Sequence, residues 1–280
     1  MTAKPLYQAI LARLEEANIE DAGFDGLQLF AHHTGMKVAN LLADPQKEIP
    51  PAQETALWQD VERRCNHEPL QYILGSWEFY GLPFLVGPGV LIPRADTEVL
   101  VDETLRLLED VSAPKVVDLC TGSGCIPITL AKHRPDGTFV GVELSQQAAD
   151  YCKKNIKAND ISNMTLLERN IFDGPLELCG LDCITANPPY IPKKDLATLS
   201  KEVGQEPQMA LDGGEDGLDF YRFIISRWTP ALKKEGMMAL EVGIDQWQAV
   251  ESLLQEQFEQ IYVVPDLNNI PRVLLGIGRI

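Results

Sequence analysis

Asn187, Pro188, Pro189 and Tyr190 form the stretch NPPY, which ends an apolar segment over residues 181–186. The side-chain oxygen of Asn187 can accept one N–H bond of a planar amino group, and the carbonyl of Pro188 can accept the other. Pro189 restricts the conformation of Pro188, and the ring of Tyr190 can pack against the planar group. The stretch indicates a site that makes a planar amino group nucleophilic, although alone it also fits a plain strand end.

A glycine-containing loop, Thr121-Gly122-Ser123-Gly124, lies between a predicted strand and a predicted helix. Glycine accepts positive φ and lets the backbone approach a ligand, and the helix N-terminus offers unpaired N–H groups. Asp118 precedes the loop, and Glu143 ends the next predicted strand. An acid at the position of Glu143 typically accepts hydrogen bonds from ribose hydroxyls. The loop and the two acids together indicate a ligand that contains adenosine.

The third glycine of the dinucleotide-binding pattern GxGxxG is missing, because Pro127 follows Gly122 and Gly124 at that position. Proline cannot provide the close helix packing that this glycine allows. S-adenosylmethionine has no pyrophosphate to bind, and acids near its ammonium and ribose groups are more useful. Asp118 and Glu143 fit that requirement, so we expect S-adenosylmethionine as the cofactor and no metal.

Segments typical of strands and helices alternate from about residue 95 onward, which favours a parallel sheet with helices on both faces. The predicted strands cover 115–120, 138–144, 164–169, 181–187, 236–242, 261–266 and 272–278. The predicted helices cover 99–110, 126–133, 146–160, about 218–232 and 245–258. A short loop joins the last two strands, which are therefore expected to pair antiparallel. Ligands bind beyond the carboxyl ends of parallel strands, where both TGSG and NPPY fall.

The first part of the chain has a different character. Apolar residues recur at helical spacing between residues 5 and 72, in short stretches that predict a small bundle. Residues 76–93 are rich in aromatic, β-branched, glycine and proline residues, which predicts a hairpin or an extended connector. We expect a helical domain over 1–75, a connector over 76–94 and a catalytic domain over 95–280.

Composition limits the class of protein and its partners. The 280 residues carry 41 acidic and 24 basic side chains, a formal charge of −17, without a basic block that would attract a phosphate backbone. A basic protein partner suits this charge better than nucleic acid. No run approaches the roughly 18 to 20 apolar residues that span a membrane, and the N-terminal pattern is not that of a signal peptide. A cytoplasmic protein with reduced cysteines is expected.

Several stretches together resemble the HemK family of release-factor glutamine N5-methyltransferases, which belongs to the class I methyltransferases. The matching stretches are EPLQYILG (68–75), GLPFLVGPGVLIPRADTE (81–98), DLCTGSG (118–124), NPPYIP (187–192) and EPQMALDGGEDGLDFYR (206–222). The resemblance implies an α/β fold with a Rossmann-like sheet, mostly parallel with an antiparallel last strand, and a small N-terminal helical bundle. It also implies transfer of a methyl group from S-adenosylmethionine to the glutamine of the GGQ motif in class-1 peptide chain release factors.

The resemblance further implies roles for individual residues. The glutamine amide would be held by Asn187, Pro188, Pro189 and Tyr190, with Asn187, Pro188 and Tyr190 as the catalytic group, and Phe84 would face it from the connector. The cofactor would contact Asp118, Cys120, Thr121, Gly122, Ser123, Gly124, Glu143, Asn170, Ile171 and Asn187. The helical domain would recognise the protein substrate.

Two other hypotheses remain open from the sequence. Enzymes that methylate amino groups of nucleic-acid bases share the NPPY stretch and would act on a flipped base. A non-enzymatic adaptor that keeps the cofactor fold only to bind release factors would bind without turnover. The charge of −17 counts against the first alternative.

Overall fold

The computed structural model describes all residues from 1 to 280 and divides the chain into two compact units. The first unit contains Met1–Ser76 and Ser200–Gln205, and the second contains Trp77–Leu199 and Glu206–Ile280. The connector over 77–94 therefore belongs to the second unit, and a short segment from the second half of the chain completes the first.

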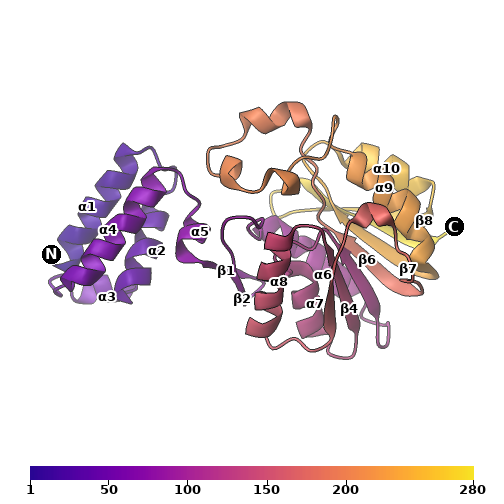
Figure 1. Ribbon diagram of the computed structural model, residues 1–280, viewed down its shortest axis with the longest axis horizontal. Coiled ribbons are helices and arrows are strands. Elements are labelled where there is room, and N and C mark those ends of the chain that lie inside the picture. The colour runs from indigo at the N-terminus through magenta and orange to yellow at the C-terminus, as the bar shows by residue number, and fades with distance from the viewer. The chain divides into compact units, whose positions relative to one another are not determined.

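The first unit is a helical bundle (Figure 1). It consists of α1 (Ala3–Glu16), α2 (Ala22–Thr34), α3 (Val38–Ala43), α4 (Pro51–Cys65) and α5 (Leu70–Leu74). Apolar side chains at helical spacing, among them Leu6, Ile10 and Leu14 of α1, are fully buried. The segment Ser200–Gln205 is bound to this bundle because Glu202 accepts hydrogen bonds from Arg64 (3.2 Å) and pairs with His67 (3.0 Å).

The second unit is built on a mixed seven-stranded sheet with the order β5-β4-β3-β6-β7-β9-β8. The strands are β3 (Lys115–Leu119), β4 (Thr138–Glu143), β5 (Met164–Glu168), β6 (Leu181–Ala186), β7 (Leu232–Glu241), β8 (Phe258–Pro265) and β9 (Pro271–Arg279). The first five pair parallel, whereas β9 runs antiparallel to both β7 and β8. The predicted fold class and the antiparallel closing strand are confirmed. The structure also shows that β9 lies between β7 and β8, which the sequence did not predict.

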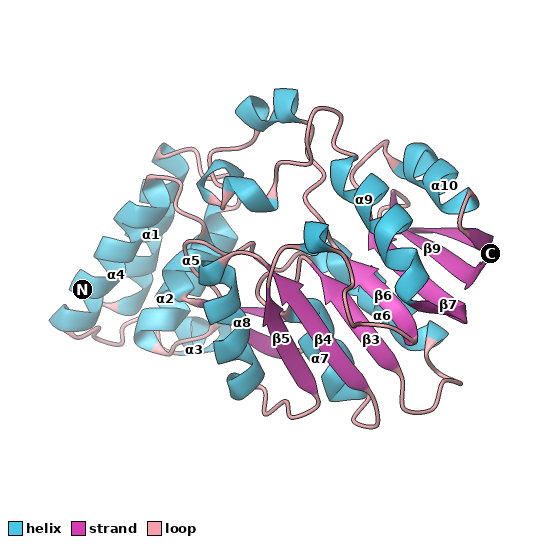
Figure 2. Ribbon diagram, turned by 45° about the vertical axis from the view of Figure 1, so that its right-hand side comes forward, coloured by secondary structure: helices cyan, strands magenta, loops and turns pink.

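Helices cover both faces of this sheet (Figure 2). One face packs against α6 (Glu98–Leu107), α7 (Cys125–His133) and α8 (Gln146–Ala158), and the other against α9 (Asp219–Trp228) and α10 (Trp247–Gln255). Side chains alternate between the two cores: Val116 faces the first and Val117 the second. This two-residue period, with both faces buried, explains the nearly continuous apolar sequence of the central strands.

A two-stranded sheet of β1 (Ser76–Phe79) and β2 (Leu82–Leu85) lies against the second unit. Asn155 of α8, which has no exposed surface, fixes this hairpin. Its Oδ1 accepts from the Leu85 N–H at 2.7 Å, and its Nδ2 donates to the Leu85 carbonyl at 3.1 Å. The same Nδ2 donates to the Ser123 carbonyl at 2.9 Å. One buried amide therefore joins the hairpin to the glycine loop.

The first prediction concerns Asn155. In Asn155→Ala the part-buried N–H and carbonyl of Leu85 and the buried carbonyl of Ser123 lose their partner, so the free energy of unfolding in urea should fall by about 3 kcal/mol. The control Lys157→Ala, at an exposed position of the same helix, should change it by less than about 0.5 kcal/mol. An Asn155→Ala variant as stable as this control would contradict the role of the amide.

Candidate active site

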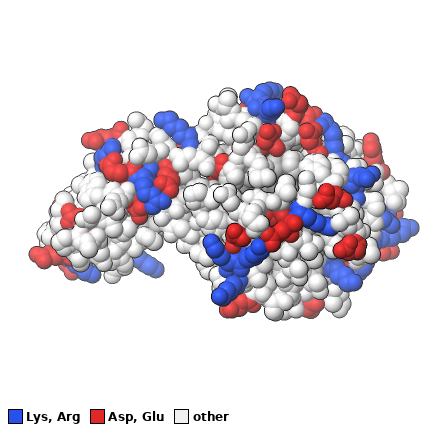
Figure 3. Space-filling model, in the orientation of Figure 1, with Lys and Arg blue, Asp and Glu red and all other residues white.

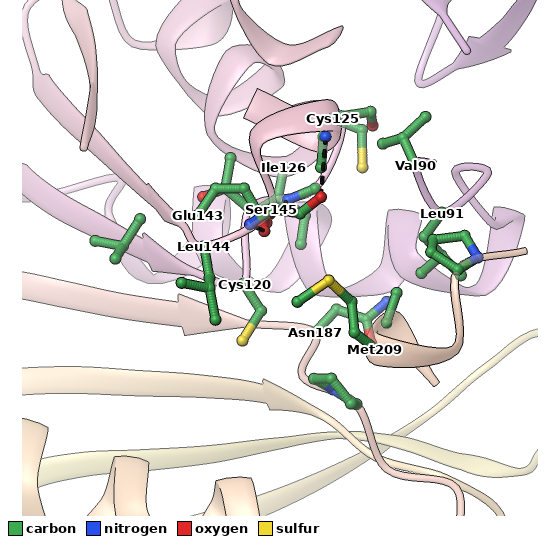
Figure 4. Close-up of a pocket in the computed structure, with 18 of the residues that line it drawn as sticks. Val90, Leu91, Cys120, Cys125, Ile126, Glu143, Leu144, Ser145, Asn187 and Met209 are labelled. Atoms are coloured by element: carbon green, nitrogen blue, oxygen red, sulfur yellow. Dashed lines mark hydrogen bonds between the residues drawn. The ribbon is translucent and has the colours of Figure 1, made fainter. Parts of the chain in front are cut away.

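A cavity opens at the carboxyl edge of the sheet, where the loops after β3, β4, β5 and β6 meet. Figure 4 shows Cys120, Glu143 and Asn187 from three of these loops around the cavity, together with Leu91 and Met209. Of the residues predicted from the sequence, those that line it are Cys120, Thr121, Gly122, Ser123, Glu143, Asn170, Ile171, Asn187 and Pro189. Its only charged lining residues are Glu143 and Arg94.

The loop after β3 has the backbone of a ligand-binding turn. Cys120, Gly122 and Gly124 all have positive φ, of 58°, 57° and 84°. A Cβ atom on Gly122 would meet only the Cys120 carbonyl, 4.0 Å away, so this glycine leaves the cavity open. A Cβ atom on Gly124 would lie 2.8 Å from the Cys152 sulfur, so this second glycine permits close packing of α7 on α8. Gly124 itself does not line the cavity.

Glu143 ends β4 and holds the glycine loop in place. Its Oε2 accepts from the Gly122 N–H and its Oε1 from the Ser145 N–H, both at 2.7 Å. Burial raises the pKa of this carboxyl above its ordinary value, while the two backbone N–H groups act in the opposite direction. Each oxygen keeps a second lone pair, so Glu143 can still accept hydrogen bonds from the hydroxyls of a sugar.

Asn170 and Ile171 line the side of the cavity that follows β5. The Asn170 Oδ1 accepts from the Phe172 N–H at 3.0 Å, so its two amide hydrogens remain available as donors. Ile171 is held by its carbonyl, which accepts from the Trp228 indole at 3.0 Å. Phe172 also lines the cavity and packs against Phe220 with ring centroids 5.2 Å apart. A planar base would therefore meet an apolar wall and a polar amide.

Asp118 is fully buried and is not among the residues that line the cavity, so its predicted contact with the cofactor stays a prediction. Its two oxygens accept from the hydroxyls of Thr121 (2.8 Å) and Thr185 (2.7 Å), which joins the glycine loop to β6. Burial raises the pKa of Asp118 to about 7, although both hydroxyl hydrogen bonds lower it.

Phe84 does not line the cavity. Its side chain has no exposed surface and packs edge-on against Phe79, with ring centroids 5.9 Å apart. It belongs to the core in this structure, and its predicted contact with the substrate amide stays a prediction. Leu91, further along the same connector, lines the cavity instead. Apolar residues alternate along the connector, and the sequence alone did not distinguish the buried positions from those facing the cavity.

The NPPY stretch follows β6 and is held by the segment 211–217. Ile191 donates to the Leu211 carbonyl and accepts from the Gly213 N–H, both at 2.9 Å. A Cβ atom on Gly213 would lie 2.7 Å from the Tyr190 Cα, so glycine is required there for close approach. The GGEDG stretch (213–217) therefore holds the loop after β6 in place.

The four NPPY residues differ in whether they line the cavity. Asn187 and Pro189 line the cavity, whereas Pro188 and Tyr190 do not. The ring of Tyr190 packs against the core beneath α9 and α10, and burial raises the pKa of its hydroxyl to about 12. The Asn187 Nδ2 donates to the Thr97 hydroxyl at 3.2 Å. Thr97 belongs to the RADTE stretch, and sequence reasoning did not include it in the site.

The segment before Thr97 is fixed by Glu206. The Glu206 carboxylate accepts from the Ile92 N–H at 3.0 Å and forms an ion pair with Arg94. Asp96 pairs with Arg272 of β9 at 3.1 Å. These contacts join residues more than a hundred positions apart in the sequence. They give Glu206 and Arg272 structural roles that spacing alone did not reveal.

Comparisons with known proteins agree with this fold. Residues 6–75 match the family model of the PrmC N-terminal domain, and residues 112–178 match that of a putative methyltransferase. Among solved structures, the hMettl16 catalytic domain in complex with the MAT2A 3′UTR hairpin 6 superposes with a TM-score of 0.57 at 15% identity, covering 81% of this chain and 82% of that chain. This likeness concerns the fold alone. The fold is that of the class I methyltransferases.

Full-length relatives narrow the class. The release factor glutamine methyltransferase of Geobacter sulfurreducens is 41% identical over 265 residues, which cover 94% of this chain and 92% of the relative. That of Moorella thermoacetica is 35% identical over 281 residues, covering 100% and 99%. The chain belongs to the family of release factor glutamine methyltransferases.

The second prediction follows from the pKa of Asp118. In the unfolded chain this group titrates near 3.8, so between pH 4 and 7 the folded state binds more protons than the unfolded state. Stability from this group is therefore present at low pH and lost as the pH rises through about 7, by on the order of 4 kcal/mol. Asp118→Asn should remove this dependence and gain stability relative to the native protein between pH 5 and 8.

The matched control is Asp136→Asn. Arg134 lowers the pKa of Asp136 to about 2, so the effect of this substitution should not change between pH 5 and 8. Urea unfolding at several pH values measures both variants. A pH-independent difference between Asp118→Asn and the native protein would contradict the assignment.

Proposed function

We propose that this protein transfers the methyl group of S-adenosylmethionine to the side-chain amide nitrogen of a glutamine in a release factor, the GGQ glutamine of class-1 factors. The observation that carries the proposal is the position of Asn187, which lines the same cavity as the glycine loop and Glu143 and is held by its Nδ2 alone. The family of the full-length relatives supports the same reaction.

The residues around the cavity fit the cofactor. Gly122 leaves open space where any other residue would place a Cβ atom, and Glu143 offers lone pairs for ribose hydroxyls. The free amide hydrogens of Asn170 can donate to a ring nitrogen of the adenine, beside Ile171 and Phe172. When bound, the cofactor supplies a methyl group on a positively charged sulfur.

The site activates the amide by accepting hydrogen bonds rather than by removing a proton first. Glu143 is the only carboxylate that lines the cavity, and both its oxygens are bound to backbone N–H groups, so no free base stands there. The Oδ1 of Asn187 would accept one N–H bond of the glutamine amide. Pro188 does not line the cavity, so the predicted role of its carbonyl as the second acceptor stays a prediction. Accepting a hydrogen bond stabilises the positive charge that develops on the nitrogen, and one proton then leaves to water.

The substrate is a protein in this proposal, and its recognition falls to the helical unit. Figure 3 shows basic side chains interspersed with acidic ones on the face drawn, and pairs such as Lys153 with Glu168 (2.7 Å) neutralise them locally. With a formal charge of −17, this surface favours a basic partner over a phosphate backbone. No helix is long and apolar enough to cross a membrane. The proposed reaction belongs to translation termination, in the cytoplasm.

The third prediction is the experiment on the substrate. The protein is incubated with methyl-labelled S-adenosylmethionine and a class-1 release factor, either native or with the GGQ glutamine replaced by alanine. Label should enter the native factor and not the variant, because the attacking nitrogen is absent from the latter. Separate reactions with DNA and ribosomal RNA should stay unlabelled. Equal label in both factors, or label in a nucleic acid, would refute the proposal, and binding without any transfer would favour the adaptor hypothesis.

A further inference from the structure

The side-chain amide of Asn187 has a partner on its nitrogen side. Its Nδ2 donates to the Thr97 hydroxyl at 3.2 Å. Thr97 is 2% exposed and occupies the N-cap position of α6, where a threonine hydroxyl ordinarily accepts from the first turn of the helix. Here it makes no such cap. The hydroxyl is instead directed toward Asn187, which indicates a role outside the helix.

The Thr97 hydroxyl also lies close to the carboxyl group of Glu241 and lowers the pKa of that group. Glu241 is the last residue of β7 and is 1% exposed. In the sheet, Ala186 is paired with Leu240, so Asn187, which follows β6, and Glu241, which ends β7, lie at the same edge. The Glu241 Oε2 has no hydrogen-bond partner. A buried carboxyl with one oxygen unpaired is costly, and the function described so far does not explain it.

The order of these bonds determines which way the Asn187 amide faces. An ionised carboxylate only accepts, and a hydroxyl has a single hydrogen to donate. A Thr97 hydroxyl turned toward an ionised Glu241 would donate to it and would keep a lone pair to accept from Asn187. If the amide turned over, its oxygen would face the lone pairs of the Thr97 oxygen. The chain of bonds from Asn187 through Thr97 to Glu241 thus keeps the amide nitrogen inward and Oδ1 free for the cavity.

We propose that Thr97 and Glu241 are positioning residues, which hold Asn187 with its side-chain oxygen toward the substrate amide. The inference rests on the proposed function, because it assigns the two residues to the orientation of the acceptor in that reaction. Neither residue needs to touch the reacting atoms. An amide turned the other way would present a donor to the substrate N–H and would oppose the reaction.

A dependence on pH follows from the same chain of bonds. Burial raises the pKa of Glu241 to about 7, and the negative charge of Asp96 also raises it. The Thr97 hydroxyl and the positive charges of Arg272 and Arg94 lower it. Tyr190, also close by, stays neutral because its own pKa is raised to about 12. A protonated Glu241 can donate to Thr97, which can then donate to the Asn187 Oδ1. The amide would turn over, so kcat should rise as the pH increases through about 7.

The test begins with Thr97→Val, which keeps the shape of the side chain and removes the hydroxyl. We expect kcat for release-factor methylation to fall about 10- to 100-fold, with the Kd of S-adenosylmethionine within about 3-fold of native. Thr97→Ser should recover most of the lost kcat because it restores the hydroxyl. The control Thr104→Val removes another buried hydroxyl of α6, one bound to the Leu100 carbonyl at 2.7 Å, and should leave kcat near native.

Glu241→Gln tests the second residue. The glutamine cannot ionise, so kcat should be nearly constant between pH 6 and 8, where the native rate rises. A native rate that does not rise in this range, or a Glu241→Gln variant with the native pH profile, would overturn the inference. So would Thr97→Val with the native kcat. The native profile needs no variant, so the absence of a rise would overturn the inference even if a substitution at Glu241 prevents folding.

Asn187→Ala separates this inference from the function on which it rests. If Asn187→Ala keeps the native kcat, the proposed role of Asn187 is refuted, and the inference about its orientation is refuted with it. If Asn187→Ala loses activity while Thr97→Val and Glu241→Gln behave as native, the proposed function stands and only the inference is overturned.

Discussion

The parallel pairing of β3, β4, β6 and β7 is the constraint on which the rest of the site depends. It brings the carboxyl ends of these strands to one edge. Glu143 and Glu241 are the last residues of β4 and β7, and the glycine turn and Asn187 lie in the loops after β3 and β6. Neither the cofactor loop nor the NPPY loop could reach the other without this pairing. A slip of one residue in the register would also exchange the two buried faces of each strand, so the apolar cores fix the geometry of the edge.

Buried polar groups join the loops at this edge to one another and so fix the geometry of the site. Asp118 joins the glycine loop to β6 through two hydroxyls, and Asn155 joins the same loop to the hairpin. The RADTE stretch is attached through Arg94, Asp96 and Thr97 to three separate segments. Buried polar networks of this kind are stabilising only when their members are paired. The unpaired oxygen of Glu241 is an exception, and it lies next to the residue that holds Asn187.

The strands, helices and sheet type of the second unit could be predicted from the sequence because apolar periods and glycine turns are local signals. The predicted strand over 138–144 is β4, and the predicted helix over 146–160 is α8. The placement of β9 between β7 and β8 depends on packing between distant segments and has no local signal. The same is true of Ser200–Gln205, which lies in the sequence of the catalytic domain and packs with the helical unit.

The site was predictable to the extent that its residues belong to short motifs. Cys120, Gly122 and Asn187 stand in such motifs and line the cavity. The burial of Phe84 could not be predicted, because an aromatic residue in a connector has the same appearance in sequence whether it faces the core or a ligand.

Thr97 was missed for a related reason. Its partner Asn187 lies 90 positions further along the chain, and no local pattern connects the two. The positive φ of Cys120 could not be predicted either, because glycine is the residue that ordinarily adopts this conformation.

The central claim is that Asn187 acts as a hydrogen-bond acceptor for the substrate amide. A crystal structure with S-adenosylhomocysteine and a peptide that contains the GGQ sequence tests it most directly. The Asn187 Oδ1 should lie about 3 Å from the amide nitrogen of the glutamine, with its Nδ2 still on Thr97. A glutamine amide bound away from Asn187, or one that meets the Asn187 nitrogen instead of its oxygen, would contradict the account.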